Sequence, residues 1–146
     1  MSKLSVVMIS MNEEKAVAAV IEDIKSVVAD AEILIVDSST DKTAEIAESL
    51  GAKVIKQFPP KGYGRAMELA LKSASGDIVI TLDCDGTYPT KEIPNLISLI
   101  EKGYDLVSTT RVQKRPKTMP FENFLANRFF AFLTFIRHGI ETTDVH

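Results

Sequence analysis

The sequence has very little cysteine, no long apolar run and no excess of basic residues, and each of these absences excludes a class of protein. Its single cysteine, Cys84, cannot form an internal disulfide. The longest apolar run, residues 129–136, is interrupted by Thr134, whereas a membrane-spanning helix needs roughly 20 apolar residues. The formal net charge of −3 lacks the broad Lys and Arg excess that nucleic-acid binding requires. We therefore expect no membrane-spanning segment and no nucleic-acid partner.

The composition that is present is that of an ordinary soluble domain. The 146 residues are 45% hydrophobic and 25% charged, close to the average for globular proteins and far from the polar signature of disorder. A chain of this length can bury a continuous core as one domain. The N-terminus, Met1-Ser2-Lys3, runs directly into a strand-like segment without the architecture of a signal peptide. We expect a single domain over residues 1–146, located in the cytoplasm.

Strand-like and helix-like segments alternate along the chain. Apolar runs rich in Val and Ile predict five buried strands, at residues 4–9, 33–36, 53–55, 78–82 and 106–107. Apolar residues at helical spacing and glycine stop signals predict helices at about 17–28, 41–50 and 64–74. Strands linked by helices in this way form right-handed crossovers. We therefore predict an α/β fold, with a mostly parallel central sheet and helices on both of its faces.

Four loops lie at the sheet edge where ligands bind in open α/β folds. They comprise residues 10–14, 37–41, 61–65 and 83–86. Acidic residues dominate three of the four loops. Carboxylates repel a bare phosphate, so these loops predict either a metal ion or a ligand rich in hydroxyl and N–H donors.

Asp83 and Asp85 are candidate ligands for Mg²⁺ or Mn²⁺. Residues two apart on a strand leave the same face, which pairs two hard oxygen ligands and turns Cys84 to the other face. These ions are held by one or two carboxylates, and diphosphate oxygens can complete their coordination. The structural alternative is that Asp83 caps a turn or helix and that Asp85-Gly86 forms an ordinary turn. Cys84 is expected to pack in the core, because thiolate suits softer metals.

Three other loop features have both a binding and a structural interpretation. Asp37 is placed to accept a hydrogen bond from a nucleobase N–H or a ribose hydroxyl, or to form an Asx-type turn with Ser39 or Thr40. Asn12 is a candidate N-cap of the first helix. The glycines of residues 61–65 indicate either close backbone approach to a ligand or a flexible turn. That segment has neither the P-loop nor the dinucleotide-binding fingerprint.

Taken together, the loops resemble those of the family-2 glycosyltransferases of GT-A fold, particularly the dolichyl- and polyprenyl-phosphate sugar transferases such as dolichol-phosphate mannose synthase. The resemblance covers essentially the whole chain. Its motifs are Asn12-Glu13-Glu14, the nucleobase loop at 37–41, and the metal motif with its following turn at 83–89. The family continues beyond the position of His146, so the resemblance implies a chain truncated on its C-terminal, acceptor side.

The resemblance also implies a role for each site residue. Asp83 and Asp85 would contact the donor diphosphate through the metal, and Asp85 and Arg111 would be the catalytic residues. The acceptor phosphate would be bound by Arg111, Lys114 and Arg115. The donor would be a GDP- or UDP-linked sugar, bound by Asn12, Glu13, Asp37, Lys61, Gly64, Asp83 and Asp85.

The function expected on this basis is the inverting, metal-dependent transfer of a sugar from a nucleoside diphosphate to a polyprenyl or dolichyl phosphate. An acceptor oxygen attacks the anomeric carbon from the face opposite the leaving group, whose charge the metal neutralises. A nucleotidyltransferase is the alternative enzyme, but it would need a glycine-rich, basic loop after the first strand, which residues 11–14 lack. A nucleotide-sugar-binding module without turnover is the alternative from a different class.

Two features favour a lipid-linked phosphate as the acceptor. A basic loop formed by Arg111, Lys114, Arg115 and Lys117 suits a phosphate head group or an anionic membrane surface. Apolar residues between Phe121 and Ile136 cover about half of the circumference of one helix, more than a core-facing stripe needs. A solvated loop and packing in the core are the structural alternatives. An ionised phosphate also needs a general base less than a sugar hydroxyl does, and the loops contain no His, although Asp144 is available. We therefore expect peripheral contact with the cytoplasmic face of a membrane.

Overall fold

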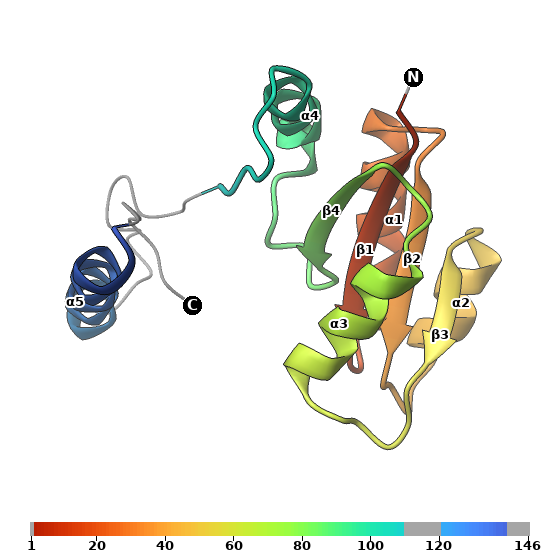
Figure 1. Cartoon of the computed structure of the whole chain (residues 1–146). Coiled ribbons are helices and arrows are strands. Elements are labelled where there is room, and N and C mark those ends of the chain that lie inside the picture. The colour runs from red at the N-terminus through yellow and green to blue at the C-terminus, as the bar shows by residue number, and fades with distance from the viewer. Residues whose placement is uncertain (1, 110–120, 140–146) are drawn as a thin grey trace. The chain divides into compact units, whose positions relative to one another are not determined.

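The computed structural model (Figure 1) describes residues 2–109 and 121–139. The chain divides into two compact units, Met1–Asp105 and Leu106–His146. The first unit contains all the described strands and four of the described α-helices, and the second contains the helix α5. That the 146 residues form a single domain stays a prediction.

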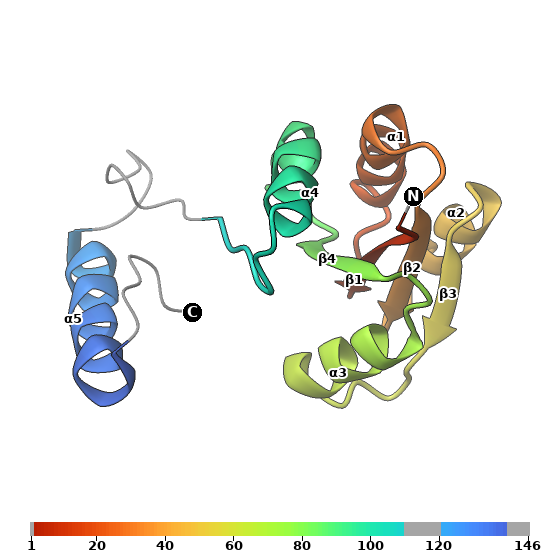
Figure 2. The ribbon, with the colours of Figure 1, turned by 45° about the horizontal axis from the view of Figure 1, so that its top comes forward.

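The first unit is built around a sheet of four parallel strands in the order β3-β2-β1-β4. A helix connects each strand to the next along the chain, as parallel neighbours require. Figure 2 shows α1 and α2 on one face of the sheet and α3 on the other, which confirms the predicted α/β class. The bounds are β1 Leu4–Ser10, α1 Val17–Val27, β2 Glu32–Asp37, α2 Thr43–Ser49, β3 Lys53–Lys56, α3 Tyr63–Ser73 and β4 Ile78–Asp83.

The alternation of side chains along each strand divides the core into two layers. Val6 and Met8 of β1 pack with α1 and α2, whereas Val7 between them packs with α3. β2 repeats this pattern, with Ile35 in the first layer and Leu34 in the second. Strands whose two faces are both covered need apolar residues at nearly every position. The Val- and Ile-rich runs of the sequence meet that requirement.

The strand order reverses between β1 and β4. From β1 the chain moves to β2 and β3 on one side, and α3 then carries it back to β4 on the other side. In open α/β sheets, the loops that follow the two strands at such a reversal separate and leave a crevice for a ligand. The topology therefore places a crevice beyond Ser10 and Asp83, the last residues of β1 and β4.

A polar cluster around Glu32 lies at the N-terminal ends of the strands, away from the crevice. The carboxylate of Glu32 accepts hydrogen bonds from the hydroxyl of Ser5 and from the backbone N–H (2.8 Å) and hydroxyl (2.9 Å) of Ser75. These bonds, that from Ser5 first, lower the pKa of Glu32 to about 2. Gly76 is needed beside the cluster, because a Cβ at that position would lie 2.7 Å from the backbone oxygen of Lys3. The cluster thus ties the loop before β4 to β1 and β2.

The sequence predictions of the first four strands and first three helices are confirmed, with small shifts at their ends. The fifth predicted strand, at residues 106–107, is wrong, because residues 106–109 have no regular secondary structure and Leu106 is 85% exposed. An apolar pair followed by hydroxyl residues buries too little surface to offset the entropy of ordering a strand. Helix α4, Ile93–Glu101, was not predicted; a short 3₁₀ turn, Thr90–Glu92, leads into it, and Pro94 in its first turn is its sequence signal.

The described residues of the second unit form one helix, α5, Phe121–His138, where the apolar pattern predicts a helix. Phe129 and Phe130 contact each other edge to face, with 5.9 Å between ring centroids. Within the described residues, no helix is both long and apolar enough to cross a membrane. Among the side chains of α5 that the structure describes, the exposed large apolar ones are Leu125, Phe129, Phe130, Phe132, Leu133, Phe135 and Ile136.

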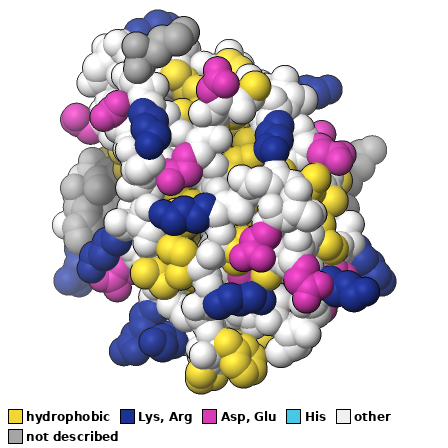
Figure 3. Space-filling model, turned by 90° about the vertical axis from the view of Figure 1, so that its right-hand side faces the viewer, with side chains coloured by type: hydrophobic (Ala, Val, Ile, Leu, Met, Phe, Trp, Pro, Cys, Tyr) yellow, Lys and Arg dark blue, Asp and Glu magenta, His cyan; other side chains and the backbone are white. Residues whose placement is uncertain are grey.

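Basic and acidic side chains are interspersed on the face shown in Figure 3. An example of such a surface pair lies on α3, where Lys72 and Glu68 are one helical turn apart and both exposed. Exposed pairs of this kind contribute about 0.2–1 kcal/mol to stability. A carboxylate that is more enclosed than Glu68 is expected to contribute more to stability through its polar partners.

Replacing Glu32 with Gln is expected to lower the free energy of unfolding by about 1 kcal/mol at neutral pH, because a charged acceptor near the solvent is lost. The pKa of Glu32 lies below its ordinary value of 4.5 in the folded chain, so the stabilisation is complete above that value and disappears as the pH falls toward 2. Urea denaturation of both proteins across this range checks the prediction. Glu68→Gln is the matched control, with a smaller expected change, and a pH-independent difference for Glu32→Gln would contradict the prediction.

Candidate functional site

A cavity of about 320 Å³ lies at the C-terminal ends of β1 and β4, where the strand order reverses. Its volume is that of a small-molecule site. One wall is the loop after β1, another is Asp83–Asp85 after β4, and a third is the beginning of α3. The lining residues are Ile9, Ser10, Met11, Glu13, Ser38, Pro60, Gly62, Tyr63, Ala66, Asp83, Cys84 and Asp85.

The cavity is acidic. Glu13, Asp83 and Asp85 line it, and its lining contains no Lys, Arg or His among the described residues. The thiol of Cys84 lies near these carboxylates. Burial, and then the negative charges of Glu13, Asp37, Asp85 and Asp83, raise the pKa of Cys84 to about 12. The concentration of negative charge favours a cation and disfavours a bare anion.

Asp83 and Asp85 are held by different partners. β4 ends at Asp83, whose Oδ1 accepts a hydrogen bond from the hydroxyl of Tyr63 at 3.4 Å. Oδ1 of Asp85 accepts hydrogen bonds from the backbone N–H (2.9 Å) and the hydroxyl (2.8 Å) of Thr87. Asp85 therefore forms the turn that the structural alternative anticipates, with Gly86 at a positive φ of 76°. Within the described residues, Oδ2 of Asp85 has no hydrogen-bond donor and remains available to a ligand.

The two aspartates suit a metal that is bound together with a ligand. Among the described residues, no three His, Cys, Asp or Glu side chains are grouped closely enough to hold a metal by themselves. Asp83 and Asp85 nevertheless bring two hard oxygen ligands to one cavity. Mg²⁺ and Mn²⁺ accept such a pair when phosphate oxygens and waters complete the coordination. Cys84 is buried in the apolar core, as expected, and its raised pKa keeps it a neutral thiol.

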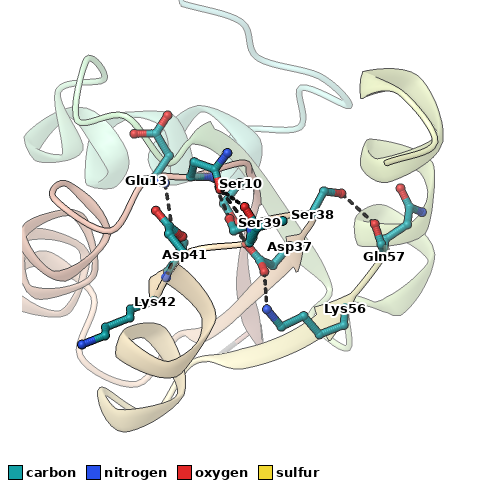
Figure 4. A network of polar contacts seen from close by, with 12 residues as sticks. Ser10, Glu13, Asp37, Ser38, Ser39, Asp41, Lys42, Lys56 and Gln57 are labelled. Carbon is teal, nitrogen blue, oxygen red and sulfur yellow. Dashed lines mark hydrogen bonds and ion pairs between the residues drawn. The ribbon is translucent and has the colours of Figure 1, made fainter. Parts of the chain in front are cut away.

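Asp37 is the most enclosed carboxylate near the cavity (Figure 4). Its Oδ1 accepts hydrogen bonds from the hydroxyls of Ser10 (2.7 Å) and Ser39, and its Oδ2 pairs with Nζ of Lys56 at 2.8 Å. Burial alone would raise the pKa of Asp37, but the bonds from Lys56, Ser39 and Ser10 together lower it below its ordinary value. The bond from Ser39 is local, but its donor is the side-chain hydroxyl and not the backbone N–H of an Asx-type turn.

Hydrogen bonds also join the loops after β1 and β2. The side-chain oxygen of Asn12 accepts a bond from the backbone N–H of Thr40 at 3.0 Å, and the N–H of Glu13 donates to the hydroxyl of Thr43 at 2.9 Å. The prediction that Asn12 caps α1 is wrong, because the N-cap is Ala16 and the side chain of Asn12 is turned to the neighbouring loop. Asn12 therefore fixes the loop that brings Glu13 to the cavity.

The beginning of α3 contributes Tyr63, which the sequence did not single out, and Gly62, one of the glycines expected to approach a ligand closely. Gly62 and Tyr63 line the cavity, whereas Lys61 and Gly64, the predicted donor contacts, are exposed and do not line it. The ion pair of Lys56 with Asp37 was not predicted either, although a Lys at the end of the strand after Asp37 indicates such a pair. In the parallel register, Lys56 lies opposite Asp37. The predicted acceptor residues Arg111, Lys114 and Arg115 lie outside the described residues.

Comparison with known proteins identifies the family. The model of glycosyl transferase family 2 matches residues 5–146. The chain belongs to this family. A dolichyl-phosphate hexose transferase of Haloferax volcanii is 43% identical over 142 residues, covering 97% of this chain and 62% of that protein. An undecaprenyl-phosphate 4-deoxy-4-formamido-L-arabinose transferase of Serratia proteamaculans is 36% identical over 124 residues, covering 77% of this chain and 38% of that protein.

Solved structures agree with the expected GT-A fold. Glucosyl-3-phosphoglycerate synthase from Mycobacterium tuberculosis, in complex with Mn²⁺, UDP and glucosyl-3-phosphoglycerate, matches with a TM-score of 0.59 and 31% identity. That match covers 68% of the family-2 chain and 39% of the synthase. Mannosyl-3-phosphoglycerate synthase from Rubrobacter xylanophilus matches with a TM-score of 0.60 and 28% identity, over 68% of this chain and 36% of that one. The family-2 chain thus spans less than two thirds of the length of each of these proteins.

Replacing Lys56 with Met should lower the free energy of unfolding by about 2 kcal/mol at neutral pH, because it leaves the charge of buried Asp37 without its cation. Lys56 holds the pKa of Asp37 down, so this stabilisation is present above the ordinary Asp value of 3.8 and is lost as the pH falls below it. Urea denaturation at several pH values measures both effects. Lys72→Met, which breaks the exposed pair with Glu68, is the control. Equal, small losses in the two variants would contradict the prediction.

Proposed function

We propose that this chain forms the donor-binding part of an inverting glycosyltransferase that moves a sugar from a nucleoside diphosphate to a polyprenyl-type lipid phosphate. The observation that carries the proposal is the cavity at the strand reversal, lined by Glu13, Asp83 and Asp85 in a chain of glycosyl transferase family 2. Three carboxylates without a lining cation repel a diphosphate unless a metal ion accompanies it. A divalent cofactor, Mg²⁺ or Mn²⁺, is therefore part of the proposal.

Asp83 and Asp85 would hold this ion. Both line the cavity, and Asp85 keeps one carboxylate oxygen free of hydrogen bonds within the described residues. When bound, the ion would neutralise the charge that develops on the departing nucleoside diphosphate. The likeness to a synthase solved with Mn²⁺ and UDP supports this assignment. The remaining task of the protein's own groups is to orient donor and acceptor.

The loops after β1 and β2 would bind the nucleoside of a UDP- or GDP-linked donor. Glu13 and Ser38 line the cavity, and Asn12 holds the two loops together. Asp37 is fully buried and both of its carboxylate oxygens already have partners, so a direct bond from the nucleoside requires neighbouring side chains to move. Without that movement, Asp37 acts by fixing the positions of its neighbours. Additional donor contacts are proposed for two residues at the beginning of α3, Lys61 and Gly64.

A lipid phosphate is the proposed acceptor. Two relatives bear the names of a dolichyl-phosphate and an undecaprenyl-phosphate transferase. Residues 106–146 contain six Lys and Arg against three Asp and Glu, whereas residues 1–105 contain eleven against seventeen. The exposed apolar side chains of α5, with Arg128 and Arg137 on the same helix, suit peripheral contact with an anionic membrane surface. The proposed acceptor site is the basic segment that contains Arg111, Lys114 and Arg115.

The transfer itself would be a single displacement. An oxygen of the acceptor phosphate forms a bond to the anomeric carbon while the bond from that carbon to the diphosphate breaks, so the configuration inverts. A phosphate is already ionised near neutral pH, and the step therefore needs no strong general base. Asp85, through the diphosphate, and Arg111, beside the acceptor, are the proposed catalytic residues.

Binding of UDP or GDP is expected to require Mg²⁺ or Mn²⁺, and Asp85→Asn should weaken it on the order of tenfold or more because a charged metal ligand is lost. Asn can keep the hydrogen bonds from Thr87, so the turn should persist. Isothermal titration calorimetry with each nucleotide, with the metal and with EDTA, measures the effect. Asp30→Asn, in an exposed turn away from the cavity, is the control. Metal-independent binding of equal affinity would contradict the metal assignment.

The acceptor can be tested with radiolabelled donor sugar. The protein is incubated with UDP- and GDP-linked sugars and either a polyprenyl phosphate or soluble sugars, and the products are partitioned between organic and aqueous phases. We expect label in the organic phase only when polyprenyl phosphate is present. Label confined to water-soluble products would contradict the lipid acceptor.

A further inference from the structure

Asp83 is held by one residue that is distant from it in the sequence. Asp85 is held locally, by two donors of Thr87 in its own turn. For Asp83, by contrast, the described part of the chain supplies a single hydrogen-bond donor, the hydroxyl of Tyr63. Tyr63 is the first residue of α3 and lies across the cavity from β4. The orientation of one carboxylate therefore depends on a side chain from the opposite wall.

The position of Tyr63 is not explained by core packing. Its side chain is 63% exposed, and the core layer beneath α3 is formed by smaller residues such as Ala66 and Ala70. Gly62, at a φ of 90°, directs the chain into the helix so that residue 63 borders the cavity. An exposed aromatic ring gains little from burial, so its contribution at this position lies in what its hydroxyl contacts.

We propose that Tyr63 is a positioning residue that orients Asp83 to receive the cation of the donor complex. A phenol that donates to Oδ1 leaves Oδ2 and its lone pairs to a metal. Carboxylates that bind metals are generally oriented by such outer hydrogen bonds, and loss of the outer partner typically lowers metal affinity about 10- to 100-fold. The bond is made to Oδ1 at 3.4 Å, which is long for an O–H donor, and Oδ2 has no donor among the described residues, so a cation can reach Oδ2 without displacing the hydroxyl.

This inference rests on the proposed metal-dependent donor binding, and it makes α3 part of that site. The same helix packs through Ala66 and Ala70 against β1 and β2, so its first residue has a fixed position relative to the sheet. Through Tyr63, the fixed position of α3 restricts the orientation of Asp83 at the end of the edge strand β4.

The test is the variant Tyr63→Phe, which removes only the hydroxyl. Mn²⁺ is titrated into the protein at a constant concentration of UDP, and separately of GDP, and the free ion is followed by its electron paramagnetic resonance signal. We expect the dissociation constant for Mn²⁺ to rise about tenfold in Tyr63→Phe. Tyr104→Phe is the matched control, because Tyr104 is similarly exposed (60%) and does not line the cavity. Its affinity for Mn²⁺ should be unchanged.

Urea denaturation of the same variants separates positioning from a structural role. The midpoint should be the same for the wild-type chain and for Tyr63→Phe, because the lost hydroxyl is exposed. A lowered midpoint together with weaker Mn²⁺ binding would overturn the inference in favour of a structural role. Unchanged or tighter Mn²⁺ binding by Tyr63→Phe would overturn it while leaving the metal site in place. Failure of the wild-type chain to bind Mn²⁺ with either nucleotide would overturn both this inference and the proposed metal dependence.

Discussion

A buried carboxylate that ties three parallel strands together is the interaction on which the rest of the site depends. Ser10, Asp37 and Lys56 are the last residues of β1, β2 and β3, and the parallel register sets them side by side. Asp37 is fully buried, so its charge is tolerated only because a hydroxyl and an ammonium group meet it there. A slip of one residue in either strand pair would turn Ser10 or Lys56 to the other face and remove its bond to the carboxylate. The register of the sheet and the pairing of Asp37 therefore enforce each other.

This pairing also divides the charge at the edge of the sheet. Lys56 neutralises Asp37, whereas Glu13, Asp83 and Asp85 line the cavity with no basic residue among its described lining. The reversal of strand order between β1 and β4 separates the two environments, because Asp37 lies on the β2 side and the aspartate pair on the β4 side. The surroundings of each carboxylate therefore determine its role. Asp37 fixes the strands, whereas Glu13, Asp83 and Asp85 remain available to a cation.

The sequence was sufficient for the first four strands, for the first three helices and for the sheet edge at which the candidate site lies, but not for α4 or for the contacts within the site. Continuous apolar runs identify β1 to β4, because both faces of the sheet are covered. The position of the site could be predicted because acidic residues directly follow several of these strands. The pair Leu106-Val107 misleads because composition cannot show whether a short apolar segment finds a surface to pack against. Lys56 and Tyr63 were missed for a common reason, since each meets its aspartate, Asp37 or Asp83, only through register or a crossover. Contacts between residues about 20 apart in sequence depend on the assembled fold.

The placement of the acidic groups has a consequence for stability as well as for binding. Glu13, Asp83 and Asp85 bring three like charges to one small cavity, and like charges repel. Any cation that binds only the folded chain would relieve the repulsion and raise stability by mass action. The same charges that create affinity for a metal-bound diphosphate therefore make the stability of this chain depend on its ligand.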